Sequence, residues 1–160
     1  MPSSPTKRRT LMRLTVDSEL PEVQEHLNAL YRALNGDLTR PMTRIADLLE
    51  NSTRKRFHTK TAPDGSLWAG LKPATLRAKT NAKGKTRGGI LVDRGDLFRS
   101  LTSFANDKMA VVGTPQIYAV YHQTGTRHMA ARPIFGLSEQ DRQDIRQLLA
   151  EWLEKTWSKT

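Results

Sequence analysis

The sequence predicts a single α+β domain with a helical hairpin, a long C-terminal helix and a small, mainly antiparallel sheet. Two observations favour helices: apolar residues recur every three or four positions across 20–57 and form a continuous stripe across 145–153. A third favours strands, because 108–113 is rich in valine and ends at a turn-like Gly-Thr-Pro-Gln run. The length of 160 residues is that of one domain.

The N-terminal residues are expected to lie outside the domain core. Residues 1–10 are polar and contain the basic run Lys7-Arg8-Arg9, which predicts a mobile tail. Residues 11–16 alternate weakly in hydropathy and favour a short strand. We therefore take 11–160 as the domain. No secretion signal is recognised, and no apolar run approaches the ~18 residues that span a bilayer.

A helical hairpin is predicted from Ser18 onward. Ser18 caps the first helix, and Gly36 ends it because glycine readily adopts the left-handed conformation that follows a helix. The second helix begins at Asp37 or Thr39, with Pro41 in its first turn, where a missing amide donor matters least. The apolar faces of the two helices comprise Leu20, Val23, Leu27, Leu30 and Leu34, and then Met42, Ile45, Leu49 and Phe57.

The middle of the chain loses helical periodicity. Pro63, Asp64 and Gly65 together predict a turn, and Trp68 is expected to pin this segment to the core. Residues 77–89 hold five basic residues, three glycines and no acid, which favours a flexible, exposed loop.

Two short elements and a long helix complete the domain. Asp96, after Gly95, is expected to cap a short helix. Residues 117–124 fit either a strand or a short helix, and we favour a helix ended by Gly125. Ser138 caps the last helix, whose acids lie near its start and whose lysines lie near its end, as the helix dipole prefers.

The chemical motifs give no positive case for catalysis. The chain lacks cysteine, so disulfides and thiolate chemistry are excluded. Residues 84–86 resemble the end of a phosphate-binding loop, but the required upstream glycine is Lys79. His122 and His128 have no acid between 118 and 136 to complete a metal site. We expect no cofactor, and a metal-dependent hydrolase built on these histidines is the third-ranked hypothesis.

Charge makes nucleic-acid binding the second-ranked hypothesis. The net charge is +10, and residues 51–100 hold twelve basic and three acidic residues, a balance of +9. Such a cluster either attracts polyanions or acidic protein surfaces, or forms a solvated loop that keeps the protein soluble. The 77–89 stretch has no aromatic residue, so contact with DNA there is electrostatic and independent of sequence. The candidate contacts are Arg77, Lys79, Lys83, Lys85 and Arg87.

Three blocks, in order, resemble the phage virion-morphogenesis family, also called tail-completion proteins. They are "APDGSLWAGLKPATLRAK" (62–79), "ILVDRGDLFRSL" (90–101), and "YAVYHQTG" (118–125) followed by "ARPIFGLSEQDRQDI" (131–145). One departure is Ala131, where the family often has proline.

The resemblance implies a late structural protein of a tailed phage or prophage, without enzyme activity. It implies a part that completes the tail or joins tail to head, acting as a ring-forming oligomer for which a hexamer is one candidate size. The expected partners are other tail or head–tail connector proteins, and the expected location is the host cytoplasm during assembly and then the tail or neck of the virion.

We assign two sets of residues as hypotheses, one to a subunit or partner interface and one to the turns and connections of the fold. The subunit or partner interface is expected to include Trp68, Tyr118, His122, Gln123, Arg132 and Phe135. Of these, the polar residues His122, Gln123 and Arg132 either fix the corner before the last helix or meet the next subunit. The turns and connections are expected to depend on Pro63, Asp64, Gly65, Gly95, Asp96, Gly125, Pro133 and Gly136. In this hypothesis Arg132-Pro133 forms an extended connection, because the residue before a proline avoids the helical conformation.

Overall fold

The computed structural model describes residues 21–158 and confirms an α+β fold. The long helices are α1 (Pro21–Ala33), α2 (Thr39–Thr59) and α6 (Glu139–Trp157). The short helices are α3 (Pro73–Lys79), α4 (Asp96–Arg99) and α5 (Ala119–Thr124). A two-stranded antiparallel sheet pairs β1 (Thr102–Ala105) with β2 (Ala110–Gly113). Within 21–158, no helix combines the length and apolar character needed to cross a membrane.

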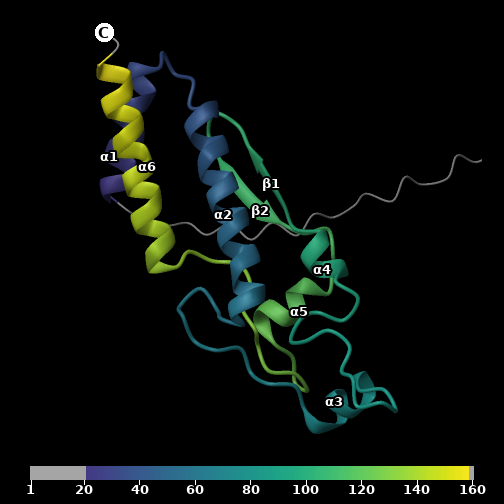
Figure 1. Ribbon diagram of the computed structural model, residues 1–160. Helices are drawn as coiled ribbons and strands as arrows, with labels where there is room; N and C mark the ends of the chain where they lie inside the picture. The colour runs from purple at the N-terminus through teal and green to yellow at the C-terminus, as the bar shows by residue number, and fades with distance from the viewer. Residues whose placement is uncertain (1–20, 159–160) are drawn as a thin grey trace, which may run out of the picture.

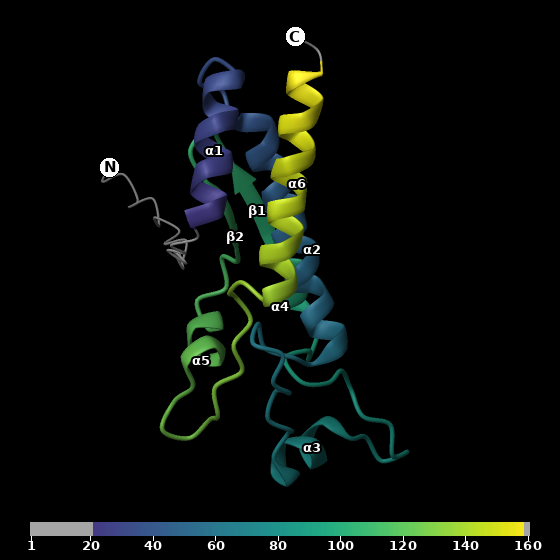
Figure 2. The same ribbon diagram turned by 90° about the vertical axis from the view of Figure 1, so that its left-hand side faces the viewer.

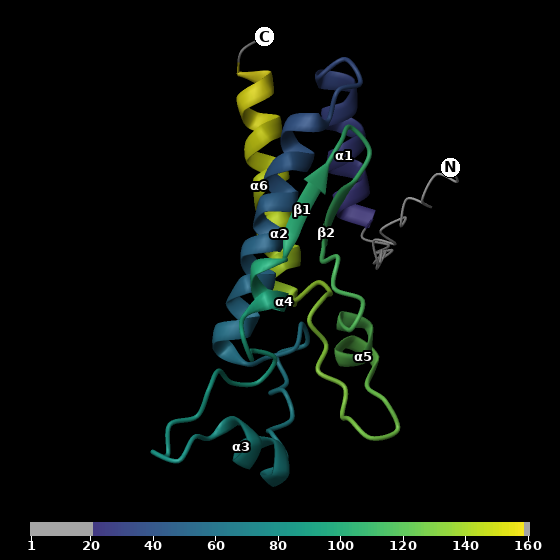
Figure 3. The same ribbon diagram turned by 90° about the vertical axis from the view of Figure 1, so that its right-hand side faces the viewer.

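The molecule is elongated, with α2 running through most of its length (Figure 1). In the upper part α6 packs against α1 and α2, and the two strands lie against another side of α2 (Figures 2 and 3). The lower part consists of α3, α4, α5 and their connecting loops (Figure 1).

Two apolar clusters stabilise these two parts, because burying apolar surface is the main favourable term in folding. The upper cluster consists of Leu30, Leu38, Met42, Ile45, Ile145, Leu149 and Leu153. The lower cluster consists of Phe57, Ala62, Trp68, Leu97, Leu101, Ala119, Ile134 and Phe135. Helix α2 contributes to both, so it links the long-helix part to the loop-rich part.

The predicted helical hairpin is confirmed. Residues Asn35 and Gly36 both have positive φ angles, 53° and 84°, and the Gly36 amide donates to the Tyr31 carbonyl at 2.8 Å. Helix α2 begins at Thr39, whose amide donates to the Asp37 carboxylate at 2.9 Å. Pro41 lies in the first turn and is buried. The predicted tail 1–10, the strand at 11–16 and the Ser18 cap lie outside the described residues.

The sheet agrees with the sequence prediction in part. The strand predicted over 108–113 is observed as β2, whereas β1 was not predicted. In the antiparallel register Phe104 pairs with Val111, and the Phe104 side chain is 61% exposed. Only four residues long, β1 alternates between exposed and half-buried positions and carries too little pattern to be recognised.

The sequence prediction was wrong at two places near the basic loop. Helix α3 was not predicted, and it places Arg77 and Lys79 on a helix, so the loop starts after Lys79. Asp96 is the first residue of α4 and not its cap, since Gly95 occupies the cap position with φ 84°. The Asp96 carboxylate instead lies 3.1 Å from the Arg99 guanidinium.

Helix α5 and its end at Gly125 are confirmed. Gly125 has φ 73° and ψ 174°, a conformation essentially restricted to glycine. A Cβ atom there would lie 2.8 Å from the Ala131 nitrogen, so the following loop packs directly on this backbone.

The start of α6 is capped as predicted and is also held by a buried ion pair. The Ser138 hydroxyl accepts from the Asp141 amide at 3.0 Å, and the Asp141 carboxylate accepts from the Ser138 amide at 2.8 Å. The same carboxylate lies 2.6 Å from Arg56 of α2. Arg56 also donates to the Ile134 carbonyl at 3.0 Å. This buried guanidinium therefore joins α2, α6 and the connection that precedes α6.

Candidate functional site

The lower part is organised around a corner between α5 and residues 131–138, the segment that leads into α6. Gln123 of α5 makes three hydrogen bonds to this segment. Its Oε1 accepts from the Ile134 and Phe135 amides at 2.8 and 3.0 Å, and its Nε2 donates to the Phe135 carbonyl at 2.9 Å. One side chain thus satisfies three backbone groups in a segment without regular secondary structure, where such groups are costly to leave unpaired.

The same segment is held from its other side by the loop after α2. The Arg132 guanidinium donates to the carbonyls of Ala69 and Gly70 at 2.7 and 2.8 Å. The Trp68 indole donates to the Pro133 carbonyl at 2.8 Å and packs edge-on against Phe57. Arg132 is only 8% exposed, so its contacts are internal to the chain. These bonds connect the first and third sequence blocks.

The Pro63–Gly65 turn packs on the end of this corner. Gly65 has φ 86°, and the Asp64 carboxylate accepts from the Ser66 amide at 2.9 Å. Gly136 has φ 149°, and a Cβ atom there would lie 2.9 Å from the Pro63 ring. Position 136 therefore has to be glycine, because a side chain there would collide with the Pro63 ring of the turn.

The predicted interface residues are brought together, but they differ in exposure. Trp68, Arg132 and Phe135 are buried, whereas Tyr118 is 39% exposed. Gln123 is half-buried, with all the hydrogen bonds given above made inside the chain. In the single chain these residues fix the corner, and Tyr118 offers the largest surface to a neighbour. Their role at an interface stays a prediction.

His122 lies at the centre of the corner without a hydrogen bond to its Nδ1 atom. Tyr118 packs edge-on against the imidazole, with ring centroids 6.0 Å apart. Burial lowers the pKa of His122 from its usual value, and the positive charge of Arg132 lowers it further. The neutral imidazole is therefore the stable form in the folded chain near pH 7.

We expect the stability of the protein to fall as the pH drops below about 6.5, in part because of His122. The unfolded chain binds a proton at this residue at a higher pH than the folded chain does, so acid favours unfolding. The variant His122→Gln should lose less free energy of unfolding between pH 7 and 5, measured by urea denaturation. The exposed His128→Gln is the matched control. Parallel pH profiles for wild type and His122→Gln would contradict this prediction.

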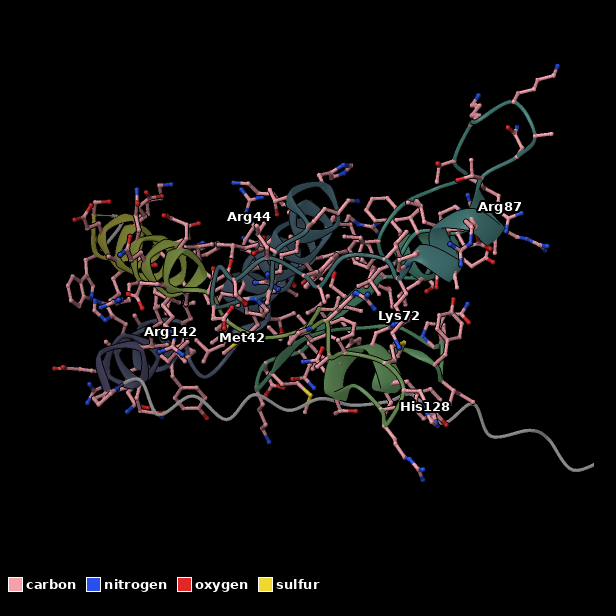
Figure 4. All side chains as sticks on the ribbon, turned by 90° about the horizontal axis from the view of Figure 1, so that it is seen from below. Met42, Arg44, Lys72, Arg87, His128 and Arg142 are labelled. Atoms are coloured by element: carbon pink, nitrogen blue, oxygen red, sulfur yellow. The ribbon has the colours of Figure 1, made fainter. Side chains whose placement is uncertain are left out.

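A groove of about 780 Å³ lies beside the corner. Its apolar walls include Leu71, Leu91, Val92, Tyr118 and Met129. Lys72 and Arg94 contribute positive charge, and Asp93 and Asp96 contribute negative charge. Seen from below, Lys72 lies near His128, whose carbonyl accepts from the Lys72 ammonium at 2.7 Å (Figure 4). This bond connects the loop before α3 with the loop after α5.

The basic segment after α3 forms a narrow hairpin that extends away from the body (Figures 3 and 4). Thr80 and Thr86 form an isolated antiparallel bridge, and the Asn81 side chain accepts from the amides of Lys83 and Lys85. The backbone is therefore organised by its own hydrogen bonds.

The five predicted DNA-contact residues divide into two groups. The Lys79 ammonium donates to the carbonyls of Gly89 and Val92, and Arg87 pairs with Asp93 at 2.9 Å. Within 21–158, the side chains of Arg77, Lys83 and Lys85 make no ion pair or hydrogen bond, and all three residues are exposed. Those three are the charges available to a partner.

The histidines do not form a recognisable metal centre. No group of three or more histidine, aspartate or glutamate side chains within the described residues could hold a metal ion. His122 is packed against Tyr118 and Arg132, which disfavours a cation at its ring.

A profile of the phage virion morphogenesis family matches residues 18–154. The chain belongs to this family. It is 32% identical over 130 residues to Mu-like prophage FluMu G protein 1 of Haemophilus influenzae, covering 79% of this chain and 86% of the relative. It is 36% identical over 110 residues to the putative capsid assembly protein G of Escherichia phage Mu, covering 63% and 70%. No solved structure matches.

Membership in the virion morphogenesis family assigns the chain a structural role in phage assembly. It also confirms the family resemblance seen in the three sequence blocks. Two of these blocks supply both sides of the corner, Trp68 from the first and Gln123 and Arg132 from the third.

Sequence reasoning missed Arg56 as a key residue of this architecture. Arg56 lies on the predicted apolar face of α2, one position before Phe57, and a single charge at such a position is a recognisable signal of a buried pair. Its partner Asp141 was noted only as a favourable charge near the start of the last helix. The helix dipole explained that acid without need of Arg56.

Proposed function

We propose that this chain completes the tail and joins it to the head during assembly of a tailed phage or prophage, acting as a ring-forming oligomer. The observation that carries this proposal is the family match over 18–154. A part at the head–tail junction also fits a relative whose name refers to capsid assembly. The expected partners are tail and head–tail connector proteins, and the expected final location is the neck or tail of the virion.

The architecture supports a structural part and not an enzyme. Gln123 and Arg132 of the corner bond to backbone groups of the same chain, and the unpaired Nδ1 atom of His122 is buried. A catalytic group needs a free polar atom within reach of a substrate. We therefore infer that the corner keeps this part of the chain rigid, as an assembly protein needs in order to present a fixed surface.

Deletion of the gene from an inducible phage tests this proposal directly. We expect lysates examined by electron microscopy to contain DNA-filled heads and separate, unjoined tails, and a plasmid copy to restore complete particles. Complete, infectious particles in the deletion lysate would contradict the proposal. Absence of heads would instead assign the chain to an earlier step in capsid assembly.

A second candidate function, sequence-independent DNA binding, is favoured by the projecting basic hairpin. Lys83 and Lys85 lie at its tip with Asn81 ordering the backbone between them. In a ring, copies of this hairpin could line an opening through which DNA passes. Phosphate contacts of this kind release counterions and weaken steeply with salt.

Reversing the charge at the hairpin tip is expected to remove DNA binding without affecting the fold. The double variant Lys83→Glu/Lys85→Glu should bind a 30-bp duplex at least about tenfold more weakly at 50 mM salt, since two phosphate contacts are replaced by repulsion. Fluorescence anisotropy from 50 to 200 mM salt measures the effect. The control is Lys108→Glu, an exposed lysine after β1. Equal affinities for tip and control variants would contradict a DNA role for the hairpin.

A further inference from the structure

The loop after α2 carries a stiff turn that presents an apolar side chain to solvent. Leu67 is 78% exposed, more than any other large apolar side chain within 21–158. The turn is rigid, because the Ala62 and Ser66 backbones are hydrogen-bonded and Asp64 accepts from both the amide and the hydroxyl of Ser66. Thr61 and Leu67 form an isolated antiparallel bridge. A surface held this rigidly loses little entropy on binding.

The groove described above has the complementary character. Leu71, Leu91 and Met129 provide apolar walls, and Lys72 and Arg94 supply positive charge next to them. The turn combines the apolar Leu67 with the exposed carboxylate of Asp64. The turn is apolar and acidic. The groove is apolar and lined by four cations, Lys72, Lys79, Arg94 and Arg132, against two acids, Asp93 and Asp96, so its net charge is opposite to that of the turn.

Leu67 is exposed and does not line the groove, so the turn is not bound in the groove of its own copy. In Figure 1 the loop after α2 projects on the left of the lower part before the chain reaches α3. The end of this loop, residues 69–72, lines the groove together with residues of α3, α4 and α5. A contact between two different patches of identical chains is head-to-tail, and it closes into a ring when the rotation between neighbours allows.

We infer that the Asp64–Leu67 turn of one copy binds in this groove of a second copy, with Leu67 between the apolar walls and Asp64 near Lys72. This inference deepens the proposed function, because it names the surfaces by which the ring would form. The occupant is a second copy of this chain, since each copy carries a matching turn that does not line its own groove.

Light scattering after size exclusion tests the contact through the oligomeric state. The substitution Leu67→Asp is expected to raise the dissociation constant of self-association by at least about tenfold, because it places a charge against apolar walls. Leu76→Asp is the matched control, since Leu76 is an exposed leucine on α3 that does not line the groove. Equal effects of the two substitutions would overturn the inference.

A charge exchange tests the pairing of Asp64 with Lys72. Asp64→Lys alone and Lys72→Glu alone should each weaken association, and the double variant should recover most of the loss, since each copy then carries both reversed charges. Failure of the double variant to recover would overturn the placement of Asp64 near Lys72.

Cross-linking covers the case of a chain that is monomeric in dilute solution. The natural sequence has no cysteine, so engineered thiols report one contact only. A copy with Ser66→Cys is mixed with a copy with Ala130→Cys and treated with a short bis-maleimide. Dimers formed in the mixture, and not from either copy alone, support the head-to-tail contact. Cross-links absent from the concentrated mixture would overturn it.

Complementation separates this inference from the proposed function. If Leu67→Asp restores infectious particles to the deletion phage, the contact is not used and the role in joining still holds. If the wild-type chain itself is dispensable for joining, the proposed function fails whatever the cross-linking shows.

Discussion

Replacing Asp141 by alanine is expected to lower the free energy of unfolding by about 3–5 kcal/mol, because it leaves the Arg56 guanidinium buried without its partner. The two side chains are 2.6 Å apart and only 6% and 3% exposed. The same substitution removes the capping interaction with the Ser138 amide. Urea denaturation followed by circular dichroism measures the loss.

The control for Asp141 is an exposed ion pair on the same helix. Glu139 lies 3.4 Å from Arg146 and its side chain is 68% exposed, so Glu139→Ala should cost less than about 1 kcal/mol. In a second test, the double variant Arg56→Met/Asp141→Leu should lose less stability than the sum of the two single changes, because no unpaired charge remains. Additive losses would show that the pair is not coupled.

The parts of the fold that could be predicted from sequence are those with a local signal. Helix α6 has an apolar stripe and a serine cap, and the α1–α2 hairpin has a glycine at its turn. Each signal lies within one or two turns of the element that it defines. The helix predicted within 117–124 was also confirmed. It ends at Gly125, whose backbone conformation is essentially restricted to glycine.

Helix α3 and strand β1 were missed because neither carries such a local signal. No side chain of α3 is buried, so no apolar periodicity marks it. Its only local cue is Pro73 at the first helical position. Strand β1 packs one face on α2 and has only four residues. This length is too short for an alternating pattern to be recognised in the sequence.

The candidate site was predictable in its residues but not in its connections. Gln123 and Arg132 were singled out from the sequence as groups that fix the corner or meet a neighbouring subunit. Their partners lie 11 to 12 and 62 to 63 positions away in the chain. Arg56 and Asp141 are 85 positions apart. Pairing over such separations depends on the tertiary fold and cannot be inferred from spacing.

Replacing Trp68 by alanine is expected to cost about 3–5 kcal/mol, the usual range for deleting a buried aromatic side chain. The Trp68 ring is 5% exposed, packs edge-on against Phe57 with centroids 5.5 Å apart, and donates to the Pro133 carbonyl. Its loss opens the lower cluster and frees one side of the corner. Trp157→Ala is the matched control: this ring is 62% exposed, so the change should stay within about 0.5 kcal/mol.

The conservative change Trp68→Phe separates packing from hydrogen bonding and tests the interface prediction for this residue. Phenylalanine keeps much of the buried ring but cannot donate to Pro133, so a loss of about 1–3 kcal/mol is expected from the unpaired carbonyl. If Trp68 acts chiefly at an interface, both variants should leave the unfolding of the isolated chain unchanged and weaken self-association instead. A large loss of stability with Trp68→Ala and a smaller one with Trp68→Phe, measured on the monomer, would place the indole in the architecture that supports the interface and not in the contact itself.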